Sequence, residues 1–168
     1  MRQSVQDCLP NIWRFALSLS GSPDTADELT QATCLRALEK SEQFIEGNKP
    51  VAWLLTICRS IWLNQLRSQK IRASQSLDTV PENALADLNS DTETNIFARE
   101  VFTHVMTLPE AHRETVMLVY VEGFSYREAA ELLKIPMGTV MSRLSAARQK
   151  LASLNTDIRN DTTSQRTT

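Results

Sequence analysis

FSYREAAELLKIPMGTVMSRLSAARQKL, the stretch from Phe124 to Leu151, predicts two short helices joined by a tight turn. Ser125 and Glu128 have the spacing of a capping box, in which each side chain bonds the backbone N–H of the other at a helix start. Pro136 lacks a backbone N–H and therefore suits a turn or the first turn of a helix. Apolar residues recur at helical spacing on both sides of this proline, so we expect a helix-turn-helix.

The second helix of this motif is expected to enter the major groove of DNA. At about 100° per residue, its inward stripe is formed by Val140, Leu144, Ala147 and Leu151. Small and polar residues lie opposite, where they allow close approach to base edges, and basic residues flank them within reach of phosphates. The expected contacts are Ser142, Ser145 and Gln149 to bases, Met141 to a thymine methyl, and Arg143 and Arg148 to phosphates. An ordinary amphipathic helix with a solvated basic face is the alternative, and the pattern alone leaves the kind of DNA-binding protein open.

The composition fits one or two small globular domains, with 168 residues and a net charge of −2. No apolar run approaches the roughly 18–20 residues of a membrane span, and the N-terminus lacks the layout of a signal peptide, so we expect a cytoplasmic location. Cys8, Cys34 and Cys58 are widely spaced and far in sequence from His104 and His112. We therefore expect reduced, buried cysteines and neither a metal site nor a cofactor.

Charge is distributed unevenly along the chain. Every charged residue from Lys49 to Arg72 is basic, and every charged residue from Ala73 to Ala98 is acidic. A second basic block, without an acidic residue, runs from Lys134 to Lys150. Two basic surfaces joined by an acidic connector predict a protein that contacts DNA at two sites and is restrained from non-specific binding.

Helical patterns predict an all-α fold with two small helical domains joined by a flexible linker, the C-terminal domain containing the helix-turn-helix. The expected helices are residues 3–19, 25–40, 51–71, 96–106 and 108–122, with a loop at 44–50. Pro10 is expected to kink the first helix or delay its start, and Gly123 to cap the last. The expected boundaries are 1–72 and 96–152 for the domains, 73–95 for the acidic linker and 153–168 for a disordered tail.

In this order, the pieces resemble a sigma factor of the extracytoplasmic-function group of the sigma-70 family. The resemblance covers nearly all of residues 5–152, and three stretches carry it: TADELTQATCLRAL from Thr25, AWLLTICRSIWLNQLRSQKIR from Ala52, and the region from Leu108 to Leu151. It implies that residues 1–72 are sigma region two, which binds core RNA polymerase and reads and melts the −10 element. Residues 96–152 would be sigma region four, which reads the −35 element. The implied partners are core RNA polymerase, promoter DNA and an anti-sigma factor, and no enzymatic activity is implied.

The resemblance assigns three sets of candidate residues. Core polymerase would be bound by residues of the second helix, whose acids suit a basic partner: Asp27, Glu28, Leu29, Gln31 and Arg36. The loop at 44–50 and the helix after it would bind −10 DNA: Phe44, Asn48, Lys49, Arg59, Trp62, Asn64, Arg67 and Lys70. The −35 DNA would be bound by Thr139, Met141, Ser142, Arg143, Ser145, Ala146, Arg148 and Gln149. Phe44 is expected either to stack on a flipped base or to lie in the core, and Trp53 is expected in the core.

The sequence departs from the family pattern at several of these positions. In place of the family's usual asparagine, small residue and aspartate, this chain has Ser60, Trp62 and Asn64, which bears on −10 reading. Lys134 replaces a family glycine, so a strained turn or a left-handed lysine is expected. Met141 and Ala146 stand where basic residues are common, which predicts an unusual −35 preference, a weaker electrostatic grip, or both.

Two other functions fit parts of the pattern. A stand-alone helix-turn-helix regulator would use its N-terminal half for ligand sensing or dimerisation, but a simple sensor domain has no use for the basic block from Lys49 to Arg72. A nuclease would need metal ligands, and Asp27 and Glu28 have neither a histidine nor a second acidic cluster to complete a site.

Overall fold

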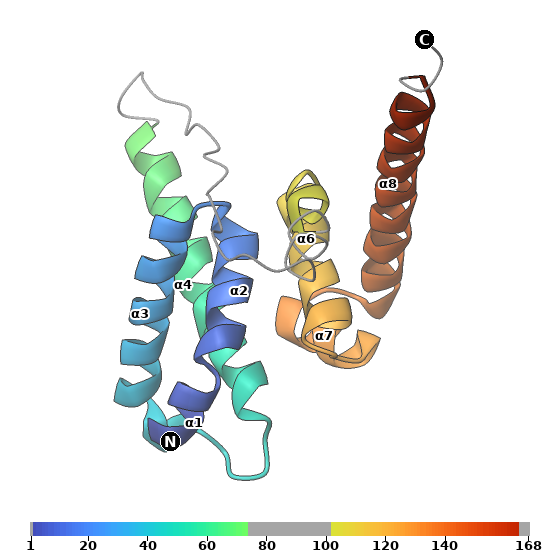
Figure 1. Ribbon diagram of the computed structural model, residues 1–168. Coiled ribbons are helices and arrows are strands. Elements are labelled where there is room, and N and C mark those ends of the chain that lie inside the picture. Colours follow the sequence, from blue (N-terminus) through green and yellow to red (C-terminus); the bar gives the residue numbers. More distant parts are fainter. Residues whose placement is uncertain (1, 74–101, 165–168) are drawn as a thin grey trace. The chain divides into compact units, whose positions relative to one another are not determined.

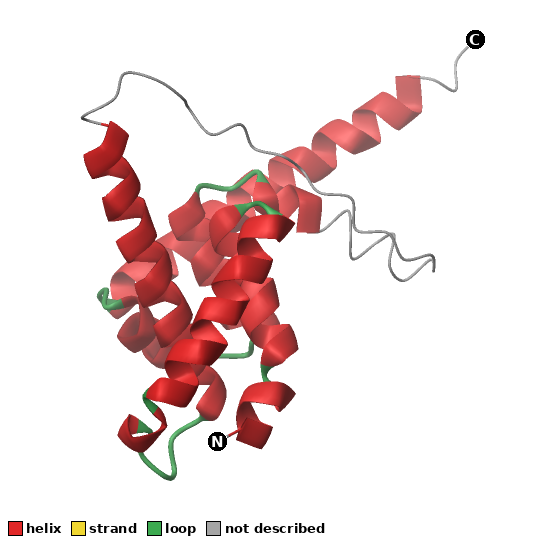
Figure 2. Ribbon diagram, turned by 90° about the vertical axis from the view of Figure 1, so that its left-hand side faces the viewer, coloured by secondary structure: helices red, strands yellow, loops and turns green. Residues whose placement is uncertain are grey.

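The computed structural model describes residues 2–73 and 102–164, and every regular element in these ranges is helical (Figure 1 and Figure 2). The expected all-α class is confirmed. The chain divides into two compact units, Met1–Asp87 and Leu88–Thr168, called unit 1 and unit 2 below. Apart from Ala73, the expected linker at 73–95 lies outside the described residues, so the domain boundaries stay a prediction. Within the described ranges, no helix combines the length and the apolar character that a membrane span needs.

Unit 1 is a small helical bundle. It contains α1 (Arg2–Asp7), α2 (Leu9–Ser20), α3 (Pro23–Glu39), the 3-10 turn η1 (Ser41–Gln43) and α4 (Pro50–Ala73). Helices α2, α3 and α4 pack against one another (Figure 1). Their common core is fully buried and includes Ile12, Phe15, Leu29, Leu54 and Leu55. Burial of these large apolar side chains is what stabilises the bundle.

The first predicted helix of unit 1 is two helices, for a local reason. The chain breaks at Cys8, because Pro10 stands in the first turn of α2 and has no N–H to continue the preceding helix. Helix α2 ends at Gly21, whose left-handed φ of 71° lets its N–H bond the Leu17 carbonyl at 2.8 Å. Of the two effects expected of Pro10, the structure shows an interruption within the helical segment and no delayed start, since α1 already begins at Arg2.

Unit 2 contains the helix-turn-helix. A helix at 102–106 is followed by α6 (Glu110–Val116), a π-helical turn η2 (Met117–Val121), α7 (Tyr126–Leu133) and α8 (Met137–Ser164). Both α6 and α7 pack on α8. Their core is almost completely buried and includes Leu108, Leu118, Leu133, Val140 and Leu144.

Two elements of unit 2 differ in extent from the sequence prediction. The helix expected over 108–122 widens into the π-helical turn, where the Glu122 N–H bonds the Met117 carbonyl, five residues back, at 2.9 Å. Gly123 then ends the segment with φ of 72°, as expected. Helix α8 continues to Ser164, whereas a disordered tail was expected from residue 153. After Gly138 the chain has no glycine or proline that would end the helix.

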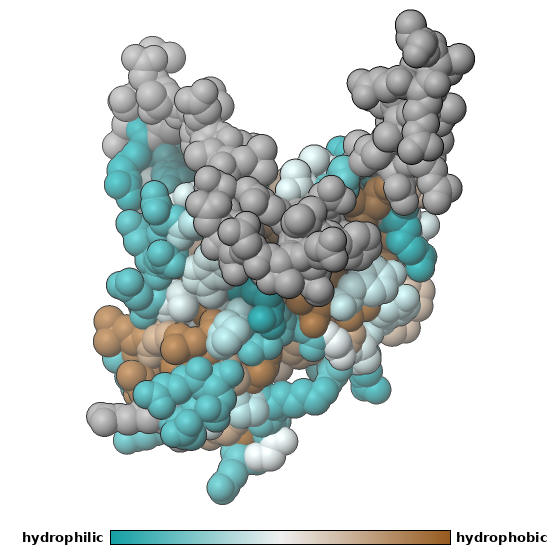
Figure 3. Space-filling model, viewed as in Figure 1, coloured by the Kyte–Doolittle hydropathy of each residue, from teal (hydrophilic) through white to brown (hydrophobic). Residues whose placement is uncertain are grey.

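Unit 1 also exposes apolar side chains. Figure 3 shows apolar residues gathered over the C-terminal part of α3, where Leu35 is 61% exposed and Leu38 is 40% exposed. Ile45, in the loop that follows, is 69% exposed. Grouped exposed apolar side chains mark surfaces that other molecules cover more often than they mark ordinary solvent-facing surface.

Candidate nucleic-acid and protein interfaces

The first helix of the helix-turn-helix, α7, begins with the capping box that its sequence predicted. The Ser125 N–H donates to a Glu128 carboxylate oxygen at 2.8 Å, and the Glu128 N–H donates to the Ser125 hydroxyl at 3.2 Å. Helix α7 ends at Lys134, whose φ of 56° and ψ of 46° are left-handed. Glycine adopts this conformation without steric cost, so the chain uses a left-handed lysine where the family pattern has glycine.

Helix α8 presents the inner and outer faces that its sequence predicted. Val140, Leu144 and Ala147 are completely buried, and Leu151 continues this stripe as a half-buried residue. The exposed residues of the outer side are Met141, Ser142, Ser145, Arg148 and Gln149. Thr139 and Ala146 are half-buried at its edges. An exposed face with small polar residues at its centre can approach base edges closely.

Arg143 does not lie on the outer flank where a phosphate contact was expected. Its Nη1 is 3.4 Å from Oε1 of Glu114 and 3.4 Å from the carbonyl oxygen of Ala111. The Glu114 side chain is 6% exposed and that of Arg143 21%. Arg143 therefore ties α8 to α6 within unit 2, a contact between positions 29 apart that no local pattern could indicate.

Two further basic residues of α8 form hydrogen bonds to other segments of unit 2. Arg148 is exposed, as expected, and its Nη1 donates to the Tyr120 hydroxyl at 3.5 Å. The Nζ of Lys150 donates to the Thr107 carbonyl at 3.2 Å. Tyr120 is 52% exposed and lies in η2, beside the outer side of α8. It is a candidate site residue that sequence patterns missed, because its partner lies 28 positions away.

Helix α3 exposes most of the residues expected to bind polymerase. Glu28, Gln31 and Arg36 are exposed, whereas Leu29 is completely buried and belongs to the core of unit 1. The expectation of Leu29 as a contact residue is wrong, because the helix turns that side chain toward α2 and α4. Asp27 is exposed and accepts a hydrogen bond from Nε1 of Trp13 at 2.7 Å, which joins α2 to α3.

The loop between η1 and α4 brings two aromatic rings together. Phe44 and Trp53 are both half-buried, with ring centroids 5.4 Å apart at an interplanar angle of 63°. Phe44 thus combines a packing contact with partial exposure, and neither of its two expected roles is excluded. Asn48 and Lys49 are exposed beside it, after Gly47, whose φ of 99° is suited to glycine.

Along α4, the candidate −10 residues differ in how far they are buried. Asn64, Arg67 and Lys70 are exposed, and Arg59 is half-buried. Trp62 is only 8% exposed and packs in the core of unit 1, so its expected place on a DNA-binding surface is wrong. A large aromatic side chain on the inner face of a long helix is stabilised by burial, and the family comparison alone could not show which way this position faces.

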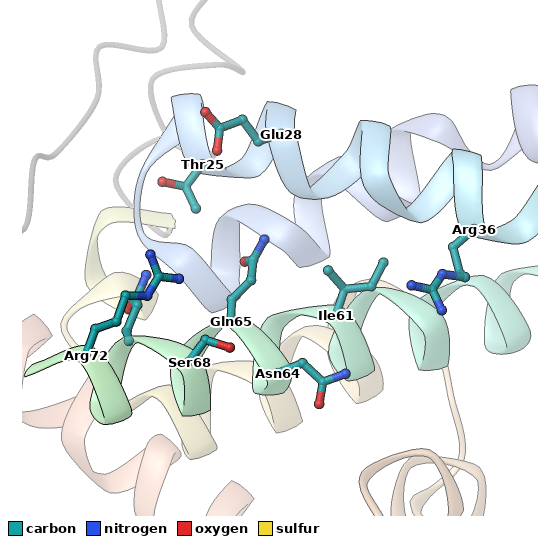
Figure 4. Close-up of a pocket in the computed structure, with 9 residues that line it drawn as sticks. Thr25, Glu28, Arg36, Ile61, Asn64, Gln65, Ser68 and Arg72 are labelled. Atoms are coloured by element: carbon teal, nitrogen blue, oxygen red, sulfur yellow. The ribbon is translucent and has the colours of Figure 1, made fainter. Parts of the chain in front are cut away.

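A groove of about 470 Å³ lies between α3 and α4 (Figure 4). Glu28 and Arg36 from α3 and Asn64 from α4 line it, together with Thr25, Ile61, Gln65, Ser68, Gln69 and Arg72. Figure 4 shows Arg36 and Arg72 at opposite ends. The groove thus brings together two residues expected to bind polymerase and one expected to bind −10 DNA, and its polar lining suits a macromolecular contact more than a small apolar ligand.

Cysteines and metal ligands form no reactive centre in the described ranges. Cys8 and Cys58 are buried and Cys34 is half-buried, all as free thiols. Burial raises the pKa of Cys58 to about 12 and also raises the pKa of Cys34. No three His, Cys, Asp or Glu side chains of the described ranges come together as a metal-binding group.

A helix-turn-helix unit and a second helical unit with a basic, polar α4 define a DNA-binding protein of the two-unit all-α class. The model for "Sigma-70 region 2" matches residues 5–71, and the model for "Sigma-70, region 4" matches residues 99–151. ECF RNA polymerase sigma factor EcfG of Rhodopseudomonas palustris is 34% identical over 154 residues, which cover 92% of this chain and 84% of that protein. ECF RNA polymerase sigma factor SigC of Mycobacterium tuberculosis is 32% identical over 143 residues, covering 84% of this chain and 75% of that one.

A solved structure extends the similarity to three dimensions. The sigma factor RpoE of Bartonella quintana, crystallised with the anti-sigma factor NepR, matches with a TM-score of 0.76 and 30% identity, over 92% of this chain and 95% of that chain. The chain belongs to the sigma-70 family, in the extracytoplasmic-function (ECF) group of RNA polymerase sigma factors. It therefore directs promoter-specific transcription initiation and is not an enzyme. Nothing supports the alternative of a stand-alone regulator.

Proposed function

We propose that unit 1 acts as sigma region two over residues 1–72 and that unit 2 acts as sigma region four over residues 96–152, with residues 73–95 as the linker. In this division of labour, unit 1 docks on core RNA polymerase and opens the −10 element, and unit 2 reads the −35 element. The observation that carries the proposal is the outer side of α8, whose small polar centre stands at the second helix of a helix-turn-helix.

The polymerase contact would use the exposed side of α3. Asp27, Glu28, Gln31 and Arg36 supply charge and hydrogen bonds there, and exposed Leu35 and Leu38 add apolar area that sequence patterns did not indicate. A polar rim around apolar anchors is the usual make-up of a specific protein interface. Leu29 takes part only by holding α3 in the bundle.

The −10 contact would use the loop after η1 and the exposed side of α4. Asn48 and Lys49 stand at the loop, where an amide can bond the edge of a flipped base, and Phe44 would present the exposed part of its ring. Arg59, Arg67 and Lys70 would follow the backbone of the displaced strand, with Asn64 between them. Trp62 supports this surface from inside the bundle.

The −35 contact would use the exposed side of α8. Ser142, Ser145 and Gln149 meet base edges, Met141 meets a thymine methyl, and Arg148 meets phosphate, with Thr139 and Ala146 at the margins. We assign Arg143 to positioning α8 rather than to phosphate, because its guanidinium is paired with Glu114.

Regulation by an anti-sigma factor is proposed from the similarity to RpoE, which was crystallised with NepR. Such an anti-sigma factor would prevent polymerase from binding, so it would cover the same surfaces that we assign to the polymerase contact. Because core RNA polymerase is its working partner, we propose a cytoplasmic location.

Run-off transcription with purified core RNA polymerase on a promoter library tests this function. The expected result is specific initiation that requires both the protein and core polymerase, with enriched −35 and −10 sequences. The free protein is expected to bind promoter duplex weakly, because its net charge is −2. Tight footprinting of a palindromic site by the free protein at physiological salt would contradict the proposal and favour a stand-alone regulator.

A further inference from the structure

We propose that Tyr120 and Arg148 together form a phosphate-binding site beside the DNA-reading face of α8. The site takes one backbone phosphate of the −35 duplex. This inference rests on the proposed −35 reading by unit 2 and adds to it a residue, Tyr120, from outside the helix-turn-helix. It assigns Arg148 one place on the DNA backbone instead of a general electrostatic role.

The π-helical turn makes Tyr120 available. An α-helix continued through Val116 would bond each N–H four residues back, but the Glu122 N–H bonds Met117 five residues back and widens the turn. Met117 and Leu118 stay buried, and the two residues at the end of the turn, Tyr120 and Val121, are 52% and 48% exposed. Widened turns of this kind occur often at functional sites.

The hydrogen bond between the two side chains leaves both able to bind an anion. Arg148 Nη1 donates to the Tyr120 hydroxyl oxygen at 3.5 Å, so the hydroxyl keeps its own proton for donation outward. A guanidinium has five N–H donors, and a single contact to tyrosine leaves the others free to bond phosphate oxygens. Two donors of different kinds on one phosphate fix its position better than a mobile arginine alone.

Arg148 and Arg143 differ in the charge of the side chain that each contacts. The guanidinium of Arg143 faces the carboxylate of Glu114, which neutralises it within unit 2. The polar partner of Arg148 is an uncharged hydroxyl, so its positive charge remains for an anionic ligand. Arg148 is also the more exposed of the two side chains.

The position of the pair along α8 fits a groove wall. Arg148 lies eleven residues after Met137, at the start of α8, which at about 1.5 Å per residue is roughly 16 Å along the helix axis. The major groove is about 12 Å wide. This stretch of α8 is longer than the groove is wide, so Arg148 and Tyr120 on the flank of the outer side can reach the phosphates of one groove wall, while Gln149 faces the bases.

The test is a methylphosphonate scan of the −35 region with the complete holoenzyme, because a methylphosphonate removes the charge of one phosphate at a time. The variants are Tyr120→Phe, which removes only the hydroxyl, and Arg148→Gln, with Val121→Ala as the matched control at a neighbouring exposed position. For the natural protein, one neutralised phosphate is expected to weaken promoter binding about 3- to 10-fold. Both variants should bind the unmodified promoter more weakly and lose sensitivity to that same phosphate, whereas Val121→Ala should keep it.

Salt dependence distinguishes the two residues. Arg148→Gln should lower the slope of log K against log salt by about 0.9, and Tyr120→Phe should leave the slope unchanged because tyrosine is neutral. Neither variant should change base preference in a randomised −35 library. If both variants keep the sensitivity of the natural protein at every phosphate, the site does not exist. If the natural holoenzyme itself shows no −35 dependence, the proposed reading by unit 2 fails, which is a separate outcome.

Discussion

Arg143 and Glu114 form an ion pair that joins the recognition helix α8 to α6, with Nη1 3.4 Å from Oε1. The carboxylate is almost completely buried, so the charge of Arg143 replaces the water that Glu114 lost on folding. Removing one member of such a pair leaves the other buried and uncompensated, which costs more than the pair itself contributes. The relationship makes Arg143 a determinant of how α8 is held.

Arg143→Ala should therefore lower the free energy of unfolding by about 2–4 kcal/mol, because the buried carboxylate of Glu114 would lose the positive charge that faces it. Urea unfolding of the full chain measures this change. Arg148→Ala, at an exposed position on the same helix, is the control and should change stability by no more than about 0.5 kcal/mol. The double variant Glu114→Leu with Arg143→Met should recover most of the loss. Equal effects of the two single arginine variants would contradict this account of the pair.

Charge reversal on α3 should weaken polymerase binding. Asp27→Lys with Glu28→Lys is expected to reduce affinity for core RNA polymerase at least about 10-fold, because like charges would face a basic partner surface. Affinity is measured by fluorescence titration and helical content by circular dichroism. Since Asp27 also accepts from Trp13, the variant Trp13→Phe is needed to separate the lost hydrogen bond from the lost charge. Unchanged affinity in the double variant with normal helical content would refute the α3 assignment.

Basic residues of α4 should affect DNA opening more than initial binding. Arg67 and Lys70 are both exposed and would hold the displaced strand. Arg67→Ala and Lys70→Ala are therefore each expected to reduce permanganate reactivity of −10 thymines several-fold. Lys134→Ala, an exposed lysine in unit 2, is the matched control. The opposite pattern, with normal melting and lost docking at the −35 element, would show that α4 has been assigned the wrong step.

Base preference should depend on the centre of the outer side of α8. Ser142→Ala or Gln149→Ala is expected to shift discrimination at one −35 position by roughly 1–3 kcal/mol. Met141→Arg should tighten binding and favour guanine nearby, because arginine bonds the major-groove edge of guanine in bidentate fashion. A randomised −35 library, scored with each holoenzyme at two salt concentrations, measures both effects. No change of preference in any of the three variants would mean that another face of α8 meets the bases.

The buried thiol of Cys58 predicts a pH dependence of stability. Burial raises its pKa from 9.0 to about 12, so the unfolded chain loses this proton first and ionisation favours unfolding. Stability from the neutral thiol is complete below pH 9 and declines as the pH rises toward 12. Between pH 8 and pH 10, the stability of the natural protein should fall relative to Cys58→Ala by about 1 kcal/mol. Parallel pH profiles for the two proteins would show that the thiol is not responsible.

Local patterns in the sequence predicted most of the fold. The capping box at Ser125, the cap at Gly123 and the break near Pro10 all depend on residues within a few positions, so their causes are visible in the sequence. The extent of α8 and the widening of α6 were missed, because packing rather than local propensity decides them. A family resemblance supplies the position of a residue but not the direction of its side chain, and Leu29 was misplaced for that reason.

The sequence also did not predict contacts between side chains that lie far apart along the chain. The alternation of apolar and polar residues on α8 correctly predicted which residues face outward near Ser142, but Arg143 sits at the boundary between the faces. Which way a boundary side chain turns depends on what stands opposite, and here that is Glu114, on another helix. Tyr120 was missed for the same physical reason, since its hydroxyl meets Arg148 only once the two segments have packed.

The widened turn at Met117–Val121 also sets a rule for the length of this segment. Deleting one residue there would restore the ordinary α-helical spacing and rotate everything downstream by about 100° relative to α6. Tyr120 would then point away from Arg148, and Gly123 would direct the chain toward the start of α7 at a different angle. Relatives that share the tyrosine–arginine pair should therefore keep the number of residues in this segment, even where an exposed position such as Val121 differs.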